Sequence, residues 1–277
     1  NRMSFQRKVY GFITTSITGC QVWLDGADSS VVSFSSGSNV STWSDKSGNG
    51  RNTTTTGTIS YANSGISITS SSSYLTGSFG TPDYTGSTLT SFIVASMNSA
   101  SGSVARLFSL GKVGTQDWDN LASITLGRGG GLLLRPYRTV PTSSPPSIPA
   151  YDTRFIGTWG QTSSLLFNSI NGGALSTASL SGAFAINAYR IGNDLLPDDA
   201  NEQFNGVINE IILYFSELTT TQRQTIEGYL SKKWGLTSLY PSIPSTHPFS
   251  SIRPHLRGFQ PIDVPGCQLW LDAADQS

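Results

Sequence analysis

The sequence is short of charge. Only 12% of its 277 residues are charged, and 17 Lys and Arg balance 17 Asp and Glu, so the formal net charge is zero. Nucleic acids attract proteins through an excess of basic residues, and none is present here. No run of roughly 20 apolar residues is available to span a bilayer, and the opening NRMSFQRKVYGF lacks the apolar segment of a signal peptide. We therefore expect no nucleic-acid partner and no membrane span.

Cysteine and histidine are scarce as well. Cys20 and Cys267 are too few for a disulfide framework, and we expect them to be buried free thiols. His247 and His255 lie away from the cysteines and from any pair of acids, so a zinc site is not expected. The absence of disulfides favours assembly in the cytoplasm over secretion.

Glycine, serine and threonine are plentiful instead. The 29 glycines are spread among Ser and Thr, a composition typical of many short strands joined by turns. In the strand candidate 207–215, apolar residues fall on both faces and are interrupted mainly by Asn209 and Glu210. This pattern favours an interior strand of a sheet that is packed on both sides.

One helix is predicted directly after this strand. Thr219, with Gln222 three residues later, forms a capping-box pattern, and Gly235 is a typical stop. Lys232 and Lys233 occupy the last turn, where cations suit the helix dipole. The apolar face that this helix must bury consists of Ile226, Tyr229, Leu230 and Trp234.

Turn chemistry accounts for several polar stretches. Asp25 and Asp28 follow the predicted first strand, 21–25, and we interpret them as turn residues, with metal ligation as the alternative. The run DKSGNG at 45–50 combines side-chain caps with glycines that adopt positive φ. Five prolines in 136–149 predict a long surface loop, because proline cannot join a central strand.

One motif occurs twice. GCQVWLDGADSS at 19–30 is matched by GCQLWLDAADQS at 266–277, and Trp23 and Trp270 lie 247 positions apart. We interpret this as a tandem array. Its parts are a linker from a preceding unit (1–18), one sandwich domain (19–250), a linker (251–265) and the first strand of a following repeat (266–277). That last strand is also a candidate for pairing with an exposed sheet edge of a neighbour.

The strand–helix segment resembles a known family. The residues G-x-I-x-E-I-x-x-Y from Gly206 to Tyr214, followed by L-T-x-x-x-R-x-x-I-E-x-Y-L-x-x-K-W-G from Leu218 to Gly235, resemble the end of a laminin-G-like domain of the concanavalin A-like lectin/glucanase superfamily. V-x-x-W-x-D-x-S-G-N-G at 40–50 resembles the segment after that family's first strand. The resemblance implies an all-β fold: a two-sheet antiparallel jelly-roll sandwich (concanavalin A-like) with one C-terminal α-helix.

The same resemblance bears on catalysis. Glucanases of this superfamily carry acids as Glu-x-Asp-x-Glu or Glu-x-Asp-x-x-Glu on one strand, since glycoside hydrolysis needs two carboxylates. Glu210 is the nearest equivalent here, and no second acid stands two or four residues after it. We therefore expect no enzymatic activity.

Two loops hold the candidate binding residues. A flat ring among carboxylates and amides suits a sugar, because the ring covers its apolar face and the polar groups bind its hydroxyls. The ligand-binding candidates are accordingly Trp118, Asp117, Asp119 and Asn120, together with Tyr137 and Tyr151. The alternative is that Trp118 packs onto the edge of the sandwich. Calcium prefers oxygen ligands, and its candidate ligands are Asp194, Asp198, Asp199 and Glu202, the alternative being a solvated acidic loop.

Together these features predict a non-catalytic structural or adhesive module of a tandem-repeat protein. Tandem domains of similar pattern occur in large DNA viruses and bacterial surface proteins, so the resemblance implies a virion component (minor capsid, spike or fibre) or a cell-surface protein. The alternative is a carbohydrate-binding, lectin-like module on a viral or bacterial surface, with calcium as a possible cofactor. The expected partners are neighbouring repeats, other virion or surface proteins, and glycans.

Overall fold

The computed structural model describes residues 14–70, 72–112, 123–128, 132–137, 145–196 and 202–236, except for the side chains of Arg135 and Tyr137. The chain divides into two units, Asn1–Pro241 and Ser242–Ser277. All described residues belong to the first unit, so the expected linker 251–265 and the repeated strand 266–277 lie outside them. Within the described part, no helix is long and apolar enough to cross a membrane.

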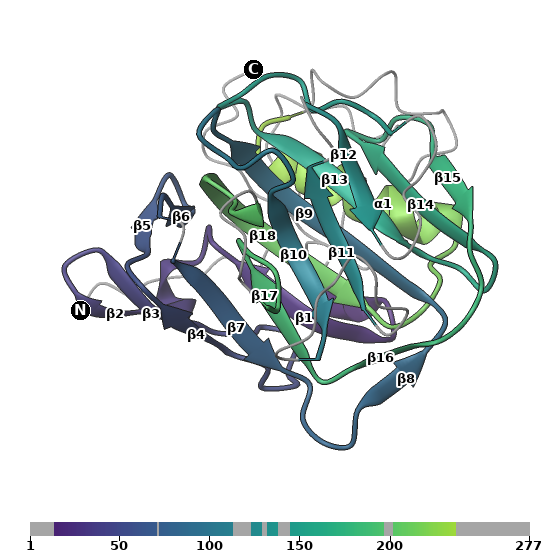
Figure 1. Cartoon of the computed structure of the whole chain (residues 1–277), viewed down its shortest axis with the longest axis horizontal. Helices are drawn as coiled ribbons and strands as arrows, with labels where there is room; N and C mark the ends of the chain where they lie inside the picture. The colour runs from purple at the N-terminus through teal and green to yellow at the C-terminus, as the bar shows by residue number, and fades with distance from the viewer. Residues whose placement is uncertain are drawn as a thin grey trace, which may run out of the picture. The chain divides into compact units, whose positions relative to one another are not determined.

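A large antiparallel sheet forms one layer of the first unit (Figure 1). Its strands run in the order β15-β14-β13-β9-β18-β6-β5-β3-β2, and β1 also pairs with β18. The strands are β1 (Cys20–Asp25), β2 (Val32–Ser36), β3 (Asn39–Trp43), β5 (Ser60–Ala62), β6 (Gly65–Ile68), β9 (Leu89–Met97), β13 (Phe155–Gln161), β14 (Leu165–Ile170), β15 (Ser176–Ser179) and β18 (Gly206–Tyr214).

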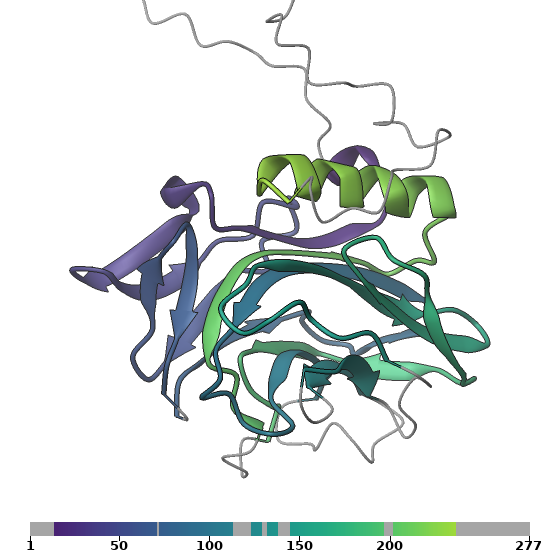
Figure 2. The same ribbon diagram turned by 90° about the horizontal axis from the view of Figure 1, so that it is seen from above.

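A smaller sheet lies across the core from it, in the order β12-β11-β10-β17-β7-β4. Its strands are β4 (Thr53–Thr56), β7 (Tyr74–Ser78), β10 (Arg106–Gly111), β11 (Ile124–Arg128), β12 (Leu134–Tyr137) and β17 (Ala188–Ile191). The remaining elements are the pair β8 (Tyr84–Gly86) and β16 (Phe184–Ile186), the helix α1 (Thr220–Lys233), and the short 3-10 helices η1 (Thr14–Ser16) and η2 (Ser29–Val31). Figure 2 shows α1 on the outer face of the large sheet, with the smaller sheet on its inner face. The all-β sandwich with one helix is thus confirmed.

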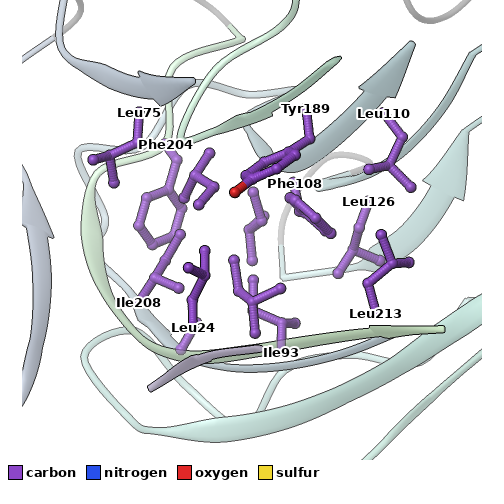
Figure 3. Close-up of a cluster of buried hydrophobic side chains, with 14 of the residues drawn as sticks. Leu24, Leu75, Ile93, Phe108, Leu110, Leu126, Tyr189, Phe204, Ile208 and Leu213 are labelled. Atoms are coloured by element: carbon purple, nitrogen blue, oxygen red, sulfur yellow. The ribbon is translucent and has the colours of Figure 1, made fainter. Parts of the chain in front are cut away.

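The main core fills the space between the two sheets (Figure 3). The large sheet contributes Leu24, Ile93, Ile208 and Leu213, and the smaller sheet contributes Leu75, Phe108, Leu110, Leu126 and Tyr189. These side chains are fully buried, and removal of apolar surface from water is the main force that holds such layers together.

The strand β18 packs on both of its faces, one against the main core and the other against the helix, as its two-sided apolar pattern predicts. Its register against β9 shifts between Ile208 and Glu210, so Asn209 is the extra residue of a β-bulge. The bulge changes the alternation of side chains. Ile208 and Ile211 therefore both face the main core, whereas Ile212 faces the helix.

The helix α1 has the predicted ends. Thr219 and Gln222 form both bonds of the capping box, and Gly235 follows at φ +68°, a conformation that glycine adopts without strain. Its apolar face forms a second cluster against the outer face of the large sheet. That cluster includes Ile17, and Tyr214 donates a hydrogen bond to the carbonyl of Thr14. Thr14 and Ile17, which precede β1, therefore pack with the outer face of the large sheet.

Several strands differ from the sequence expectation. The apolar run 185–191 gives the signal of a single strand in the sequence, but the structure divides it at Asn187 between β16 and β17, which belong to different sheets. Five strands that contain Ser, Thr or Gly carry no strong apolar alternation and were not predicted from the sequence: β2, β3, β4, β8 and β15. Pro136 lies in β12, which is an edge strand of the smaller sheet, the location where proline is tolerated.

The loop 45–51 covers the edge of β1 that does not pair with β18. Asp45 Oδ1 accepts the Trp23 N–H at 2.9 Å, and the Lys46 N–H donates to the Trp23 carbonyl at 2.8 Å. Ser47 and Arg51 both donate to the carbonyl of Gln21. The DKSGNG turn predicted from the sequence is confirmed, with Gly48 and Gly50 at positive φ, and it also caps the backbone of an edge strand.

Candidate functional site

Most of the predicted sugar-binding residues lie outside the described part of the chain. These are Trp118, Asp117, Asp119 and Asn120, and for Tyr137 only the backbone, in β12, is described. Tyr151 is described and half-buried. Its hydroxyl accepts a hydrogen bond from Arg128, whose guanidinium carbon lies 5.5 Å from the Tyr151 ring. The predicted sugar site therefore stays a prediction, with Tyr151 held by an arginine.

The predicted calcium ligands divide in the same way. Asp198 and Asp199 lie outside the described residues, whereas Asp194 and Glu202 are both buried. Glu202 pairs with Arg106 at 3.4 Å, and Asp194 accepts the N–H of Leu195. These two acids are not part of a solvated loop. In the part of the chain that the structure describes, no group of three or more His, Cys, Asp and Glu side chains is placed to hold a metal ion.

A polar pocket lies at one end of the large sheet. Its volume is about 430 Å³. The residues that line it come from the β5–β6 turn, the strands β9 and β18 and the segment before β13: Asn63, Ser64, Ser96, Asp152, Arg154 and Val207. We call this the Arg154 pocket. It combines a cation, a carboxylate, an amide, hydroxyls and one apolar side chain in a single hollow.

Asn209 fixes two walls of the Arg154 pocket. Its side chain is fully buried at the β-bulge of β18. Its Nδ2 donates to the carbonyls of Asn63 at 2.9 Å and Ser64 at 3.1 Å, and its Oδ1 accepts the Nε–H of Arg154 at 3.0 Å. One buried amide thus ties the β5–β6 turn to Arg154.

The backbone of the pocket is equally constrained. Asn63 and Ser64 have φ of 53° and 55°, the pair of positive values that a two-residue hairpin turn of the primed type requires. Asp152 has φ 58°, and its N–H donates to the carbonyl of Met97. Its Oδ1 accepts a hydrogen bond from Asn98 at 3.2 Å. The pocket is therefore built on rigid turns and strand ends.

Arg154 retains hydrogen-bonding capacity toward the pocket. Besides the bond to Asn209, one Nη2 hydrogen reaches the carbonyl of Asn63 at 3.4 Å. A guanidinium has five N–H donors, so three remain without an acceptor among the residues that the structure describes. The guanidinium carbon lies 4.9 Å from the centre of the Trp234 ring. Burial lowers the pKa of Arg154, but an arginine stays charged at any physiological pH.

A second polar cluster lies beside the pocket, between the large sheet and α1. Glu210, fully buried, accepts hydrogen bonds from Trp23 Nε1 at 2.8 Å and Tyr229 at 3.2 Å on one oxygen, and from Trp234 Nε1 at 2.6 Å on the other. Lys233 lies 2.8 Å from the second oxygen. We call these residues, with Asp25, the Glu210 cluster.

The Glu210 cluster continues as a chain of alternating charges. Lys233 also binds Asp25, and Lys46 bridges Asp25 and Asp28 at 2.9 Å each. Burial raises the pKa of Glu210, while the Lys233 ammonium acts against that rise. Both oxygens of Glu210 are already engaged, so this carboxyl is placed to join helix and sheet rather than to meet a ligand.

The thiol of Cys20 is free, as the sequence predicts, but the residue is half-buried rather than buried, and Cys267 lies outside the described residues. Burial is the main cause that raises its pKa to about 12. Because the thiolate is the reactive form, this cysteine is chemically inert at neutral pH.

The sequence signalled this region only in part. The interruption of an apolar strand by Asn209 and Glu210 marked both polar clusters. Asn63, Ser64, Asp152 and Arg154 were not singled out, because each comes from a separate turn or strand end and no spacing links them. Their meeting depends on the pairing of β18 with β6 and on the bulge at Asn209.

Comparisons with known proteins identify solved structures of similar fold, but they do not assign the chain to a family. No family model matches the chain, and no curated protein matches it by sequence. Solved structures do match. A sialidase of Trypanosoma rangeli in complex with sialic acid aligns with a TM-score of 0.55 and 11% identity over 78% of this chain. The chain spans about a third of that sialidase, 33% of its length.

Two further matches are single domains of larger proteins, one from an enzyme and one from a toxin. Domain 4 of AbnA, a GH43 extracellular arabinanase from Geobacillus stearothermophilus in complex with arabinotriose, aligns with a TM-score of 0.54 and 17% identity, covering 74% of this chain and 96% of that domain. The binding domain of botulinum neurotoxin serotype C1 aligns at 0.55 and 12%, covering 79% and 53%. At these identities the likeness shows a shared β-rich sandwich fold alone.

Proposed function

We propose that this chain is a non-catalytic adhesive module that binds a glycan in the Arg154 pocket. The observation that carries the proposal is the pocket itself. One hollow of about 430 Å³ is bordered by Arg154, Asp152 and Ser96, and three N–H donors of Arg154 have no acceptor within the described part of the chain. Sugar hydroxyls both donate and accept, so they need such a mixture of groups on rigid supports.

Two likenesses support a glycan as the ligand. The arabinanase domain whose length this chain covers almost completely was solved with arabinotriose bound. The strand–helix segment 206–235 resembles laminin-G-like domains of the concanavalin A-like lectin/glucanase superfamily, and we assign the sandwich to that superfamily as part of the proposal.

The absence of catalysis is also part of the proposal. Glycoside hydrolysis needs two carboxyl groups on either side of the bond, and the lining of the Arg154 pocket supplies one, Asp152. Glu210, which the glucanase pattern singles out, is instead enclosed by tryptophan, tyrosine and lysine donors.

A glycan array probed with the whole chain tests the binding function. We expect saturable binding by the parent chain. In Ser96→Phe the affinity should fall at least tenfold, because the new ring occupies the pocket without changing its charge. Ser33→Phe, at an exposed position of β2, is the matched control and should bind normally. Melting temperatures of both variants identify any loss of fold.

Parallel arrays with calcium and with a chelator separate this pocket from the predicted loop sites. Binding that disappears with chelator and survives Ser96→Phe would place the ligand outside the Arg154 pocket and contradict the proposal. No binding to any glycan would remove the function itself.

We propose a structural role in an array as a second function, favoured by the motif that recurs at 266–277. The protein would then be a virion or cell-surface component in which neighbouring repeats are partners. Mass spectrometry of purified particles from its source should find its peptides in the particle fraction, and their restriction to the soluble fraction would contradict this role.

A further inference from the structure

Arg154 forms no ion pair with an acidic side chain of the described residues, a property that it shares with Arg51 but not with the nearby Lys46 and Lys233. Lys46, Lys112, Arg106, Arg223 and Lys233 each form an ion pair with an Asp or Glu. No carboxylate of the described residues forms one with Arg154, although Asp152 lines the same pocket. The pocket therefore contains a partly buried cation with which no described carboxylate forms an ion pair.

The guanidinium is held in a fixed orientation. The Nε–H is bound to the buried Asn209, and the guanidinium carbon lies over the Trp234 ring, 4.9 Å from its centre. Side-chain entropy is already lost in the free protein, so a ligand gains the full benefit of binding to the Nη groups. Two adjacent N–H donors in one plane match the two oxygens of a carboxylate better than they match isolated hydroxyls.

Partial burial strengthens this preference. Arg154 is partly withdrawn from water, and its pKa is lowered by that burial. A charge in such a place interacts more strongly with an opposite charge than the same charge does at the open surface. An anionic ligand replaces the electrostatic stabilisation that the guanidinium loses when it is withdrawn from water, whereas a neutral ligand replaces only part of it.

We propose that the Arg154 pocket selects a sugar unit that carries a carboxylate, with Arg154 binding the carboxylate and Asp152 and Asn63 binding hydroxyls of the same unit. This inference rests on the proposed glycan-binding function and adds the chemical class of the ligand. The mixture of one free cation with one carboxylate suits a ligand that has an acidic group on one side and hydroxyl donors on the other.

The test compares glycans that differ only in their acidic group. The whole chain is titrated with uronic-acid and sialic-acid oligosaccharides, each beside its neutral parent, and with sulfated forms of the same parents. We expect at least tenfold tighter binding of a carboxylate form than of its parent, and a loss of that preference as salt is raised from 50 to 500 mM, because salt screens charge pairs. The salt titration needs no variant and is independent of folding defects.

Variants then assign the preference to Arg154. Arg154→Gln should reduce the tenfold preference to less than twofold, while Arg154→Lys, which keeps the charge without the planar fork, should retain part of it. Lys112→Gln removes the same charge at the end of β10, in the smaller sheet, and should change nothing. Melting temperatures show whether Arg154→Gln is folded.

The outcomes separate the two proposals. Equal binding of acidic and neutral partners, unaffected by Arg154→Gln, would overturn the acidic-sugar inference and leave glycan binding standing. A preference for sulfated forms alone would overturn the assignment to a carboxylate. Failure to bind any saccharide would overturn both proposals.

Discussion

The Arg154 pocket and the Glu210 cluster are organised by consecutive residues of β18, and they differ in role. Asn209 belongs to the first and Glu210 to the second, and Trp234 contacts both, through its ring in one case and its N–H in the other. In the Glu210 cluster, buried and half-buried donors converge on a fully buried carboxylate, and both of its oxygens are engaged. In the pocket, donors are left over beside a hollow. Polar groups whose hydrogen bonds are all made within the protein stabilise the fold. Polar groups with hydrogen-bonding capacity left over are available to a ligand.

The largest expected effect on the free energy of unfolding comes from removing the carboxylate at the centre of the Glu210 cluster. Glu210→Ala would leave the N–H groups of Trp23 and Trp234 without their acceptor and would remove one of the two acidic partners of Lys233. Removal of one member of a buried charge pair costs about 3–5 kcal/mol, and we expect a loss of that size in the free energy of unfolding, measured with urea.

Glu217→Ala is the matched control, because Glu217 is an exposed carboxylate between β18 and α1. Its effect should stay within about 0.5 kcal/mol. Similar losses for the two variants would show that the Glu210 cluster is not the element that joins helix and sheet.

A smaller effect is expected where the two regions meet. Trp234→Phe removes the N–H that binds Glu210 and keeps an aromatic ring near Arg154. We expect the free energy of unfolding to fall by about 1–3 kcal/mol, from the lost hydrogen bond and some volume, and glycan affinity to change by about threefold or less. A loss of binding as large as that of Arg154→Gln, with stability unchanged, would reverse the roles assigned to this tryptophan.

The smallest effect concerns a second buried acid under α1. Glu227 accepts a hydrogen bond from Thr158, and Arg223 lies 3.9 Å away. Burial raises the pKa of Glu227 above its usual 4.5, so the folded state holds this proton more tightly than the unfolded state does. The contribution to stability is therefore complete below pH 4.5 and is lost as pH rises through the folded-state pKa.

Glu227→Gln tests this sign. The amide oxygen can still accept from Thr158, so the free energy of unfolding at pH 4.5 should change by about 0.5 kcal/mol or less. Between pH 5 and pH 8 the variant should lose less stability than the parent. Urea titrations across that range measure the slope, and an unchanged slope would exclude Glu227 as its source.

Sequence alone predicts the parts of this molecule whose causes are local. The capping box at Thr219 and Gln222, the two-sided strand at 207–215 and the turn at 45–50 each depend on neighbouring residues, and each is confirmed. The threonine-rich β4 was missed, because it pairs with β7 and buries Thr53 through partners that lie distant in the sequence. Local pattern cannot report pairing that the rest of the sheet imposes.

The Arg154 pocket illustrates the same limit for a site. A bulge of one residue at Asn209 turns a side chain that would otherwise follow the strand's alternation toward the β5–β6 turn and Arg154. Nothing in the run VINEIIL distinguishes a bulge from regular strand. The polar pair could be identified from the sequence, but the residues that it gathers could not.

The cover over β1 has a consequence for aggregation. An uncovered strand edge is a template on which another chain can add a strand, and the danger grows when the same strand sequence is present more than once. This chain contains WLD twice, at 23–25 and 270–272. With Asp45, Lys46, Ser47 and Arg51 occupying the outer edge of β1, that edge is closed to the addition of a strand with its own sequence.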